Sequence, residues 1–259
     1  MIPKIIHYCW FGRNPLPSLA IKCIASWKKY LPDYEIKEWN EDNFDVDVIP
    51  FTKEAYAAKK YAFVSDYARF KILYEEGGLY FDTDVEVIRP LDDIISKGAF
   101  MGCECDANDT SVASVAPGLG LGVNPGLGLG VNPGLGLGVN PGLGLYKELL
   151  DLYVTLRFFN PDGSYNQKTV VQYTTELLCR HGLENIKEIQ ECAEIWIYPR
   201  EYFCPISVED GKLRLTNNTR SIHHYNQSWQ SPMRKYGRKL ILAVGGVKLK
   251  NFLKKILFR

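Results

Sequence analysis

The feature that most constrains this chain is an apolar segment that ends in two carboxylates, Asp82 and Asp84. Residues 62–76 have the pattern of a helix, Gly77 stops it, and residues 79–82 are predicted to form a buried strand. Side chains alternate along a strand, so both carboxylates are expected to project to the same side. Two like charges held that close repel each other unless a cation lies between them. Hard oxygen ligands suit Mg²⁺ or Mn²⁺, so we expect a divalent metal that holds a phosphorylated substrate.

Hydrophobic patterns around this segment predict an α/β fold with a mostly parallel sheet flanked by helices. The expected order is strand 3–10, helix 19–30, strand 34–39, a helix from about 52 or 55 to 75, and strand 79–82. Further helices are expected at 146–158 and 169–181, and short strands between 191 and 215. Ligands of such sheets bind beyond the carboxyl ends of the strands, which is where the two carboxylates are predicted to lie.

Length and composition fit one large domain, which we assign to residues 1–231, and a basic tail at 232–259. The seven cysteines form no CxxC pair and have no metal-finger spacing, which is typical of reduced thiols in a cytosol. The first residues do not resemble a signal peptide, and no apolar run reaches the roughly 18–20 residues that span a bilayer. We therefore expect a cytoplasmic protein.

Residues 118–145 are a tandem repeat, in which GLGLGVNP occurs three times and is followed by GLGL. The period is far below that of solenoid repeats. Each unit has an extended apolar piece and an Asn-Pro-Gly turn signal. We interpret the repeat as an insertion that forms an expanded surface loop or added short hairpins. A dedicated binding function is the alternative.

Asp66 and Arg69 are three residues apart on the predicted helix, so they share a face and can pair. One interpretation is a surface ion pair of little energetic value. Their neighbours are apolar on nearly all sides, however, which indicates a largely buried helix. Charges inside such a helix need a partner or a task, and we favour a functional role.

The carboxylate motif alone also allows a phosphate-ester hydrolase that uses Asp82 as its nucleophile. Such enzymes carry Thr or Val at the fifth position of an Asp-x-Asp motif, whereas this chain has Glu86 there. The motif also lies well inside the chain. Both features disfavour this alternative.

The combined motifs resemble glycosyltransferase family 32, the Asp-x-Asp sugar transferases of the bacterial capsular polysaccharide type. The resembling segments are residues 2–12, 34–43, 62–90 and 221–229. The resemblance implies a GT-A fold, a divalent cation and transfer with retention of anomeric configuration. It also implies a nucleotide-diphosphate sugar donor (a UDP-sugar is favoured) that carries a hexose or HexNAc. The implied acceptor is a glycan or glycolipid, in capsule or exopolysaccharide synthesis.

The resemblance also assigns roles to residues on the donor side of the site. Trp10 would stack on the nucleobase, and Tyr80 would lie near the nucleoside. Asp66 and Arg69 would hydrogen-bond to hydroxyls or phosphate of the donor. Two residues near the end of the domain, Ser228 and Trp229, match an element that closes over the diphosphate.

For the cation, Mn²⁺ or Mg²⁺, the resemblance implies that Asp84 binds directly and that Asp82 reaches both ribose and metal. A metal-binding histidine is expected from the pair His223 and His224, and the sequence leaves open which of the two it is. Glu104 follows the next predicted strand, and we place it toward the acceptor.

The repeat and the tail depart from the family pattern or extend beyond it. Relatives usually run from one strand directly into the helix near Tyr146, so we expect about two copies to be surplus and the acceptor side to be altered. A catalytically inactive sugar-nucleotide-binding protein is the resulting alternative. The tail mixes lysines with apolar residues, which is typical of an interfacial helix on anionic lipid and favours a peripheral site on the inner face of the cell membrane. A solvated helix or a flexible tail is the alternative. No recognition motif for nucleic acid accompanies this charge.

Overall fold

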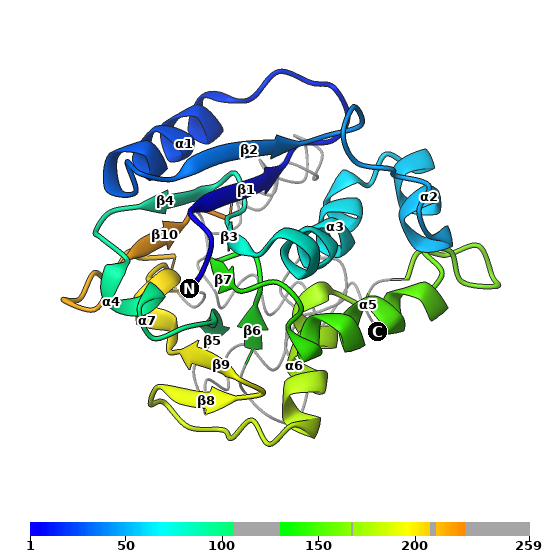
Figure 1. Cartoon of the computed structure of the whole chain (residues 1–259). Coiled ribbons are helices and arrows are strands. Elements are labelled where there is room, and N and C mark those ends of the chain that lie inside the picture. Colours follow the sequence, from blue (N-terminus) through cyan, green and yellow to red (C-terminus); the bar gives the residue numbers. More distant parts are fainter. Residues whose placement is uncertain (106–129, 167, 208–210, 226–259) are drawn as a thin grey trace, which may run out of the picture.

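An eight-stranded sheet crosses the computed structural model, which describes residues 1–105, 130–166, 168–207 and 211–225 (Figure 1). The strand order is β2-β1-β3-β7-β5-β9-β8, and β6 pairs with β5 beside this path. The strands are β1 (Ile5–Cys9), β2 (Glu35–Trp39), β3 (Gly78–Tyr80), β5 (Phe100–Cys105), β6 (Gly130–Asn132), β7 (Leu137–Val139), β8 (Gln190–Cys192) and β9 (Ile195–Tyr198). A separate pair joins β4 (Val85–Val87) to β10 (Ser221–His223).

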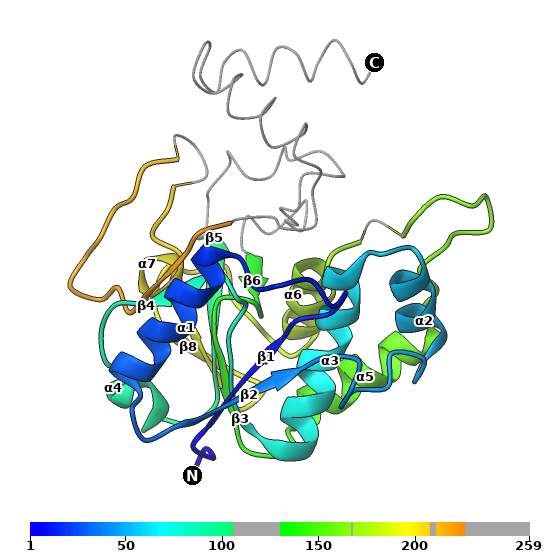
Figure 2. The ribbon, with the colours of Figure 1, turned by 90° about the horizontal axis from the view of Figure 1, so that it is seen from above.

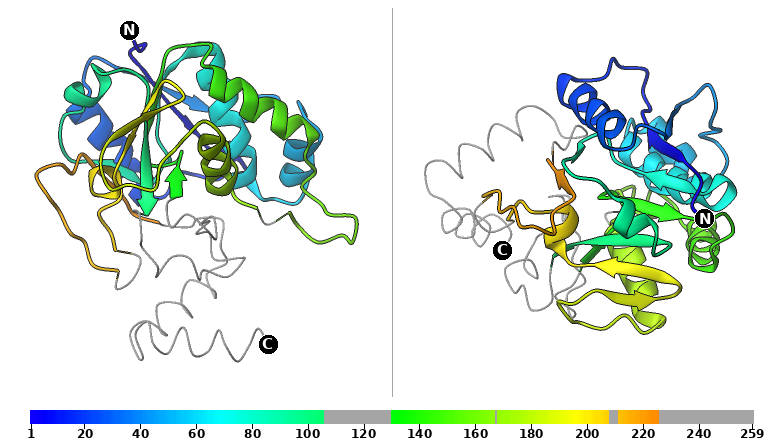
Figure 3. Two further views of the ribbon diagram at one scale, coloured as in Figure 1. Left: turned by 90° about the horizontal axis from the view of Figure 1, so that it is seen from below. Right: turned by 60° about the vertical axis from the view of Figure 1, so that its left-hand side comes forward.

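Helices cover both faces of the sheet, as the view along its edge shows (Figure 2). One face carries α1 and the short helices α4 and α7, and the other carries α2, α3, α5 and α6. Their bounds are α1 (Ser18–Tyr30), α2 (Pro50–Ala57), α3 (Tyr61–Glu76), α4 (Asp92–Ile95), α5 (Gly144–Thr155), α6 (Val170–Arg180) and α7 (Arg200–Phe203). Figure 3 shows the same separation of α1 from α5 and α6. Each layer packs on its own hydrophobic cluster.

The predicted α/β class with a mostly parallel sheet is confirmed. The strands β2, β1 and β3 are parallel neighbours, and β5 and β9 are parallel to each other. Because β7 is antiparallel to both β3 and β5, these five strands point the same way. The remaining strands of the sheet, β6, β7 and β8, run in the opposite direction. The carboxyl ends of β1, β3 and β5 therefore meet at one edge.

The helix expected from about 52 or 55 to 75 is two helices, because the chain breaks between α2 and α3. Lys59 adopts a left-handed backbone with φ of 56°. The N–H of Lys60 then donates to the carbonyl of Ala55 at 2.9 Å, which closes the turn. The predicted stop after this segment is confirmed, since α3 ends at Gly77 with φ of 67°. A side chain would be strained at that backbone.

The strand expected at 79–82 is shorter than predicted, so strand alternation is the wrong reason for the pairing of the two carboxylates. After β3 ends at Tyr80, Asp82 and Asp84 lie in a tight turn. The N–H of Val85 donates to the carbonyl of Asp82 at 3.0 Å within this turn. The turn brings the two side chains to one side before β4 begins.

The described part of the repeat, residues 130–145, is not the surface loop that we expected, but it includes a strand that leads into the helix near Tyr146, as the family resemblance implies. Residues 130–145 supply β6, β7 and the start of α5, and β7 lies between β3 and β5 in the middle of the sheet. Val131, Leu135, Leu137 and Val139 are all buried. Leucine and valine of the octapeptide fill the core on both faces because this segment is enclosed by helices. Residues 118–129 and the tail at 232–259 lie outside the described residues.

Toward the end of the described chain, β10 returns to pair antiparallel with β4, so that His223 stands opposite Val85. Figures 1 and 3 show this strand, in orange, beside α7. The strand expected at 212–215 is reduced to one bridge between Ile206 and Leu213. None of the described helices is long and apolar enough to cross a membrane. All seven cysteines lie among the described residues, and none of them is joined to another in a disulfide bond.

Candidate metal and donor site

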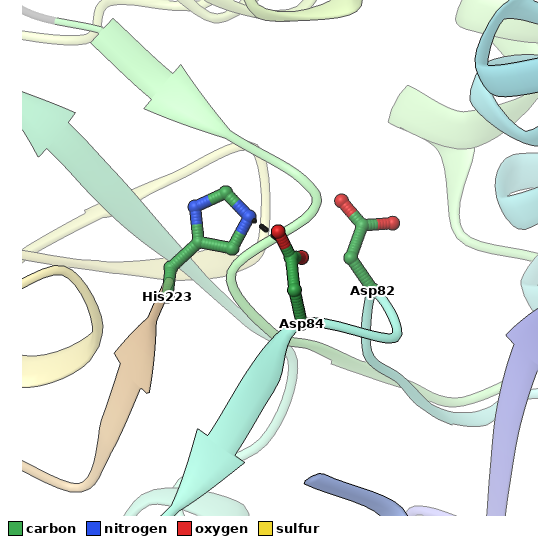
Figure 4. Close-up of side chains that lie close together, drawn as sticks. All are labelled: Asp82, Asp84 and His223. Atoms are coloured by element: carbon green, nitrogen blue, oxygen red, sulfur yellow. Dashed lines mark ion pairs between the residues drawn. The ribbon is translucent and has the colours of Figure 1, made fainter. Parts of the chain in front are cut away.

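Two carboxylates and one imidazole converge where the β3–β4 turn meets the end of β10 (Figure 4). One potential ligand atom from each of Asp82, Asp84 and His223 lies within 4.8 Å of the others. His223 Nε2 is 3.1 Å from Asp84 Oδ1. Pairing of β10 with β4 is what carries the histidine to the carboxylates from the far end of the domain.

His224 faces a different partner and stands outside this cluster. Its Nε2 lies 2.8 Å from Glu86 Oε2, and the same oxygen also binds Lys22 Nζ at 2.8 Å. His224 follows the last residue of β10, and its ring lies against Glu86 rather than Asp84. Of the two residues predicted as alternatives, the structure brings His223 to the carboxylates.

The residues of the cluster are suited to a hard divalent cation. Two carboxylate oxygens and one imidazole nitrogen are a donor set that Mn²⁺ accepts, and Mg²⁺ is bound mainly through carboxylates. Burial raises the pKa of Asp82, Arg69 opposes this effect, and the nearby Asp84 adds to it. Burial alone would lower the pKa of His223, but the charge of Asp84, its hydrogen bond to the imidazole and the charges of Asp82 and Glu104 together outweigh burial, so the pKa is raised. A bound cation would relieve the repulsion between the carboxylates and displace the histidine proton.

The predicted pair of Asp66 and Arg69 lies beside this cluster and connects to it. Arg69 Nη2 is 2.9 Å from Asp66 Oδ1 and 3.3 Å from Asp82 Oδ1, and the arginine is 3% exposed. Burial raises the pKa of Asp66 to about 7 although Arg69 opposes it. The pair is therefore an internal one at the edge of the site, and a surface ion pair is excluded.

Tyr80 and Trp10 lie at the ends of neighbouring parallel strands, β3 and β1. Tyr80 is 1% exposed, and its hydroxyl donates to Asp82 Oδ1 at 3.2 Å, so it fixes the carboxylate. Trp10 is partly exposed, and its Nε1 donates to the carbonyl of Asn14 at 2.6 Å. Gly12 lies in the loop between Trp10 and Asn14, has φ of 97° and donates its N–H to Glu41 Oε1 at 2.6 Å. This loop closes the same edge of the sheet.

Glu104, which we expected to face the acceptor, is fully buried near the end of β5. Burial raises its pKa to about 7, and Asn132 partly offsets this through a hydrogen bond. Asn132 Nδ2 donates to Glu104 Oε2 at 2.8 Å. No sequence signal marks Asn132 as a site residue. The same asparagine occurs in all three copies of the repeat, and nothing in their side chains distinguishes one copy from another.

The remaining predicted donor residues, Ser228 and Trp229, lie outside the described residues. Their role in closing over a diphosphate stays a prediction. Within the described ranges, the site is therefore built from the ends of β1, β3 and β5, from α3 and from β10.

Comparison with known proteins identifies the class to which this site belongs. Residues 17–101 match the family model described as "Glycosyltransferase sugar-binding region containing DXD motif". The match includes Asp66, Arg69 and both carboxylates of the turn, but it ends long before His223. This region is similar to the sugar-binding region of glycosyltransferases of the DXD type, which supports the enzyme class predicted from the sequence.

The chain is similar to curated proteins over part of their length. It is 29% identical over 111 residues to inositol phosphoceramide mannosyltransferase 1 of Schizosaccharomyces pombe, which covers 39% of this chain and 33% of the relative. It is 33% identical over 104 residues to inositol phosphoceramide mannosyltransferase 3 of the same yeast, covering 39% and 29%. The chain thus spans about a third of the length of the curated relatives it matches. The predicted likeness to glycosyltransferase family 32 is confirmed for this region, whereas the capsular type stays a prediction.

The chain also has partial similarity to solved structures. The PaToxG glycosyltransferase has a TM-score of 0.48 and 18% identity, with 69% of each chain covered. Mouse xyloside xylosyltransferase 1 has a TM-score of 0.47 and 14% identity, covering 87% of this chain and 99% of its own.

Proposed function

We propose that this protein is a metal-dependent glycosyltransferase of the GT-A type, which moves a sugar from a nucleotide-diphosphate donor to a glycan acceptor. One observation carries the proposal: Asp82, Asp84 and His223 present ligand atoms within 4.8 Å of one another beside the buried pair of Asp66 and Arg69. The carboxylates come from the sugar-binding region and the histidine from the other end of the domain.

The proposed chemistry depends on the charge that forms on the departing diphosphate. Bound Mn²⁺ or Mg²⁺ would supply Lewis-acid stabilisation of that charge. Asp82 and Asp84 would orient the cation, and His223 would complete its protein ligands. Arg69, fixed by two carboxylates, would present its remaining N–H groups to donor hydroxyls or phosphate. Asp66 would accept a hydrogen bond from the donor sugar. The chain's own contribution is positioning rather than a strong nucleophile.

We further propose a UDP-sugar carrying a hexose or HexNAc as the donor, with Trp10 against its base and Tyr80 near its nucleoside, and retention of configuration at the anomeric carbon. A lipid-linked glycan in capsule or exopolysaccharide synthesis is the proposed acceptor. The names of the two yeast relatives, which are mannosyltransferases for a phosphoceramide lipid, support a lipid-linked acceptor and make mannose a second donor sugar to test.

The tail at 232–259 would carry the enzyme to an anionic membrane surface on the cytoplasmic side. All of its charged side chains are basic, and they alternate with apolar residues. Flotation with anionic liposomes, with the chain ending at 231 as the control, tests this assignment. Equal flotation of both chains would remove it.

A phosphate-ester hydrolase that uses Asp82 as its nucleophile is less well supported. This carboxylate is held by Arg69 at 3.3 Å and by the Tyr80 hydroxyl at 3.2 Å, which restrains it and lowers its freedom to attack phosphorus. The inactive alternative is tested by the same assay as the proposal, because a dead sugar-nucleotide-binding protein would bind donors without hydrolysing or transferring them.

The test is a screen of uridine- and guanosine-diphosphate sugars with Mn²⁺, in which mass spectrometry follows donor hydrolysis and transfer to lipid-linked glycans. We expect one donor to be consumed with Mn²⁺ and not with EDTA. The variant Asp84→Asn should lose at least about 100-fold in rate, since it removes a ligand of the cation.

The matched control is Asp92→Asn, the same substitution on an exposed residue in the first turn of α4. It should retain the rate of the unchanged protein. Equal rates for Asp84→Asn and Asp92→Asn, or consumption of donor in EDTA, would refute the metal-dependent scheme. Analysis of the product anomer by NMR tests retention separately.

A further inference from the structure

Two identical asparagines of the repeat have different environments. Asn132, in the second copy, is 8% exposed, whereas Asn140, at the same position of the third copy, is exposed. Asn140 precedes the turn into α5, where Gly142 donates its N–H to the carbonyl of Tyr74 at 2.8 Å. The same sequence therefore makes a surface turn in one copy and an internal structure in the other.

The internal structure is a bulge that points toward the carboxylate turn. Asn132 of β6 stands opposite Gly102 of β5, and Gly138 of β7 stands opposite Phe100 of the same strand. The chain therefore advances six residues from β6 to β7 while β5 advances only two. The four surplus residues, 133–136, leave the ladder between β6 and β7. Bulges of this kind direct a strand toward a nearby site.

Asn132 fixes the start of this bulge through both polar atoms of its side-chain amide. Its Nδ2 donates to the buried Glu104 Oε2 at 2.8 Å, and its Oδ1 accepts the N–H of Gly134 at 2.7 Å. Glu104 and His223 also interact electrostatically, so the anchor lies close to the ligand cluster. An amide that uses both of its polar atoms inside a protein restrains the segments it joins.

The tip of the bulge lies against Asp82. The carbonyl of Gly134 accepts the N–H of Asp82 at 3.2 Å. A Cβ atom on Gly134 would lie 2.0 Å from Asp82 Oδ2 and 3.1 Å from Arg69 Nη1. Only a residue without a side chain fits there, so the backbone of Gly134 packs directly against the Asp82 carboxylate and keeps it beside Asp84 and Arg69.

We propose that the repeat is part of the active site, in which Asn132 of the second copy and Glu104 hold Gly134, the first residue of the third copy, against Asp82 and so position this carboxylate for the cation. The residues are positioning residues, since none of them is placed among the ligands. This inference rests on the proposed metal-dependent function, and it assigns the repeat to the donor side rather than to the acceptor side.

The first test compares Asn132→Ala with Asn140→Ala, the same change in two copies of one octapeptide. Mn²⁺ affinity is measured by electron paramagnetic resonance on the full chain without donor. We expect Asn132→Ala to weaken Mn²⁺ binding about 10- to 100-fold, the usual effect of losing a partner that orients a metal ligand. Asn140→Ala should bind as the unchanged protein does, because its side chain is exposed.

A swap of hydrogen-bonding groups separates positioning from general damage. Asn132→Asp puts two carboxylates together and should weaken Mn²⁺ binding, whereas Glu104→Gln with Asn132→Asp restores one donor and one acceptor and keeps the net charge. The double variant should return to within about threefold of the unchanged protein, because the coupling between contacting residues is recovered. If the alanine variant is unfolded by circular dichroism, this double variant decides the question.

The third comparison is Gly134→Ala against Gly144→Ala, where an added Cβ meets nothing within 4 Å. Gly134→Ala alone should weaken Mn²⁺ binding and broaden the Mn²⁺ signal. Equal Mn²⁺ affinity for Asn132→Ala and Asn140→Ala, or a double swap no better than Asn132→Asp, would overturn the inference. If the unchanged protein itself binds no Mn²⁺, the proposed function fails instead, so the two failures are distinguishable.

Discussion

His223 Nε2 lies 3.1 Å from Asp84 Oδ1, and this contact closes the candidate metal site with a residue from the far end of the domain. The two side chains meet because β10 pairs antiparallel with β4, immediately after the carboxylate turn. A site assembled this way exists only when the domain is folded. Metal binding should therefore stabilise the fold and raise its melting temperature.

The first prediction concerns the two adjacent histidines. We expect His223→Ala to weaken Mn²⁺ binding at least about tenfold, since it removes a ligand nitrogen, and to abolish the rise in melting temperature that Mn²⁺ causes. His224→Ala should keep both, because His224 pairs with Glu86 outside the cluster. Calorimetric titration and thermal unfolding measure the two effects. Loss of Mn²⁺ binding in His224→Ala alone would show that the histidines had been assigned in reverse.

The second prediction concerns Arg69, which is enclosed between Asp66 and Asp82. Arg69→Ala leaves two partly buried carboxylates without their buried cation and should lower the free energy of unfolding by about 3 kcal/mol. The control is Arg157→Ala, which breaks a pair with Glu54 in which the arginine side chain is 65% exposed. That change should cost less than about 1 kcal/mol. Urea unfolding at pH 7 distinguishes them, and similar losses in both variants would contradict the burial argument.

The third prediction is a dependence of stability on pH that arises from His7. This side chain is fully buried in β1, where burial lowers its pKa from 6.5 to about 4. Its Nδ1 accepts from Trp39 Nε1 at 3.0 Å and its Nε2 bonds to the carbonyl of Gly77 at 2.9 Å. In the unfolded chain His7 is protonated below about pH 6.5, whereas in the folded chain it is protonated only below about pH 4.

The free energy of unfolding should therefore fall as pH is lowered from about 6.5 to about 4, by up to about 3 kcal/mol from this group. His7→Gln keeps one donor and one acceptor and removes the titration, so its curve should be flatter over the same interval. Urea unfolding at half-unit pH steps measures both curves. Parallel curves for the two proteins would rule out His7 as the source.

The fourth prediction tests the burial of the repeat in the sheet. A Cβ on Gly138 would lie 2.2 Å from Phe100 Cε1, so Gly138→Ala should lower the free energy of unfolding by about 1–3 kcal/mol through overpacking. Gly144→Ala, at the start of α5, should be neutral or stabilising because alanine favours the helix. Chemical unfolding of the two variants gives the comparison. No loss of stability in Gly138→Ala would argue that β7 does not lie between β3 and β5.

Much of the fold could be predicted from periodicity and from turn residues. The strands at the positions of β1 and β2, the helix α1 and the stop at Gly77 follow from local patterns, and the structure agrees with them. The break between α2 and α3 was missed because it depends on a left-handed residue, Lys59, whose identity gives no such signal. Tertiary contacts decide such positions.

The site was predictable to a different degree. Asp82, Asp84, Asp66 and Arg69 stand in one short segment, and their spacing and apolar surroundings indicated a common site. The choice of His223 over His224 required the register of β10 on β4, which no local pattern contains. The position of Asn132 could not be predicted at all, since three identical copies offer three identical asparagines.

The even length of the octapeptide has a consequence for how the sheet is specified. A shift of the chain by one whole copy keeps every side chain on its own face, because the period of a strand is two residues. Deleting any one copy also yields the same protein sequence as deleting another. The register of β6 and β7 is thus degenerate in side-chain chemistry. Loss or gain of one unit during replication of the gene would therefore leave an identical asparagine and an identical glycine available for the place beside Asp82.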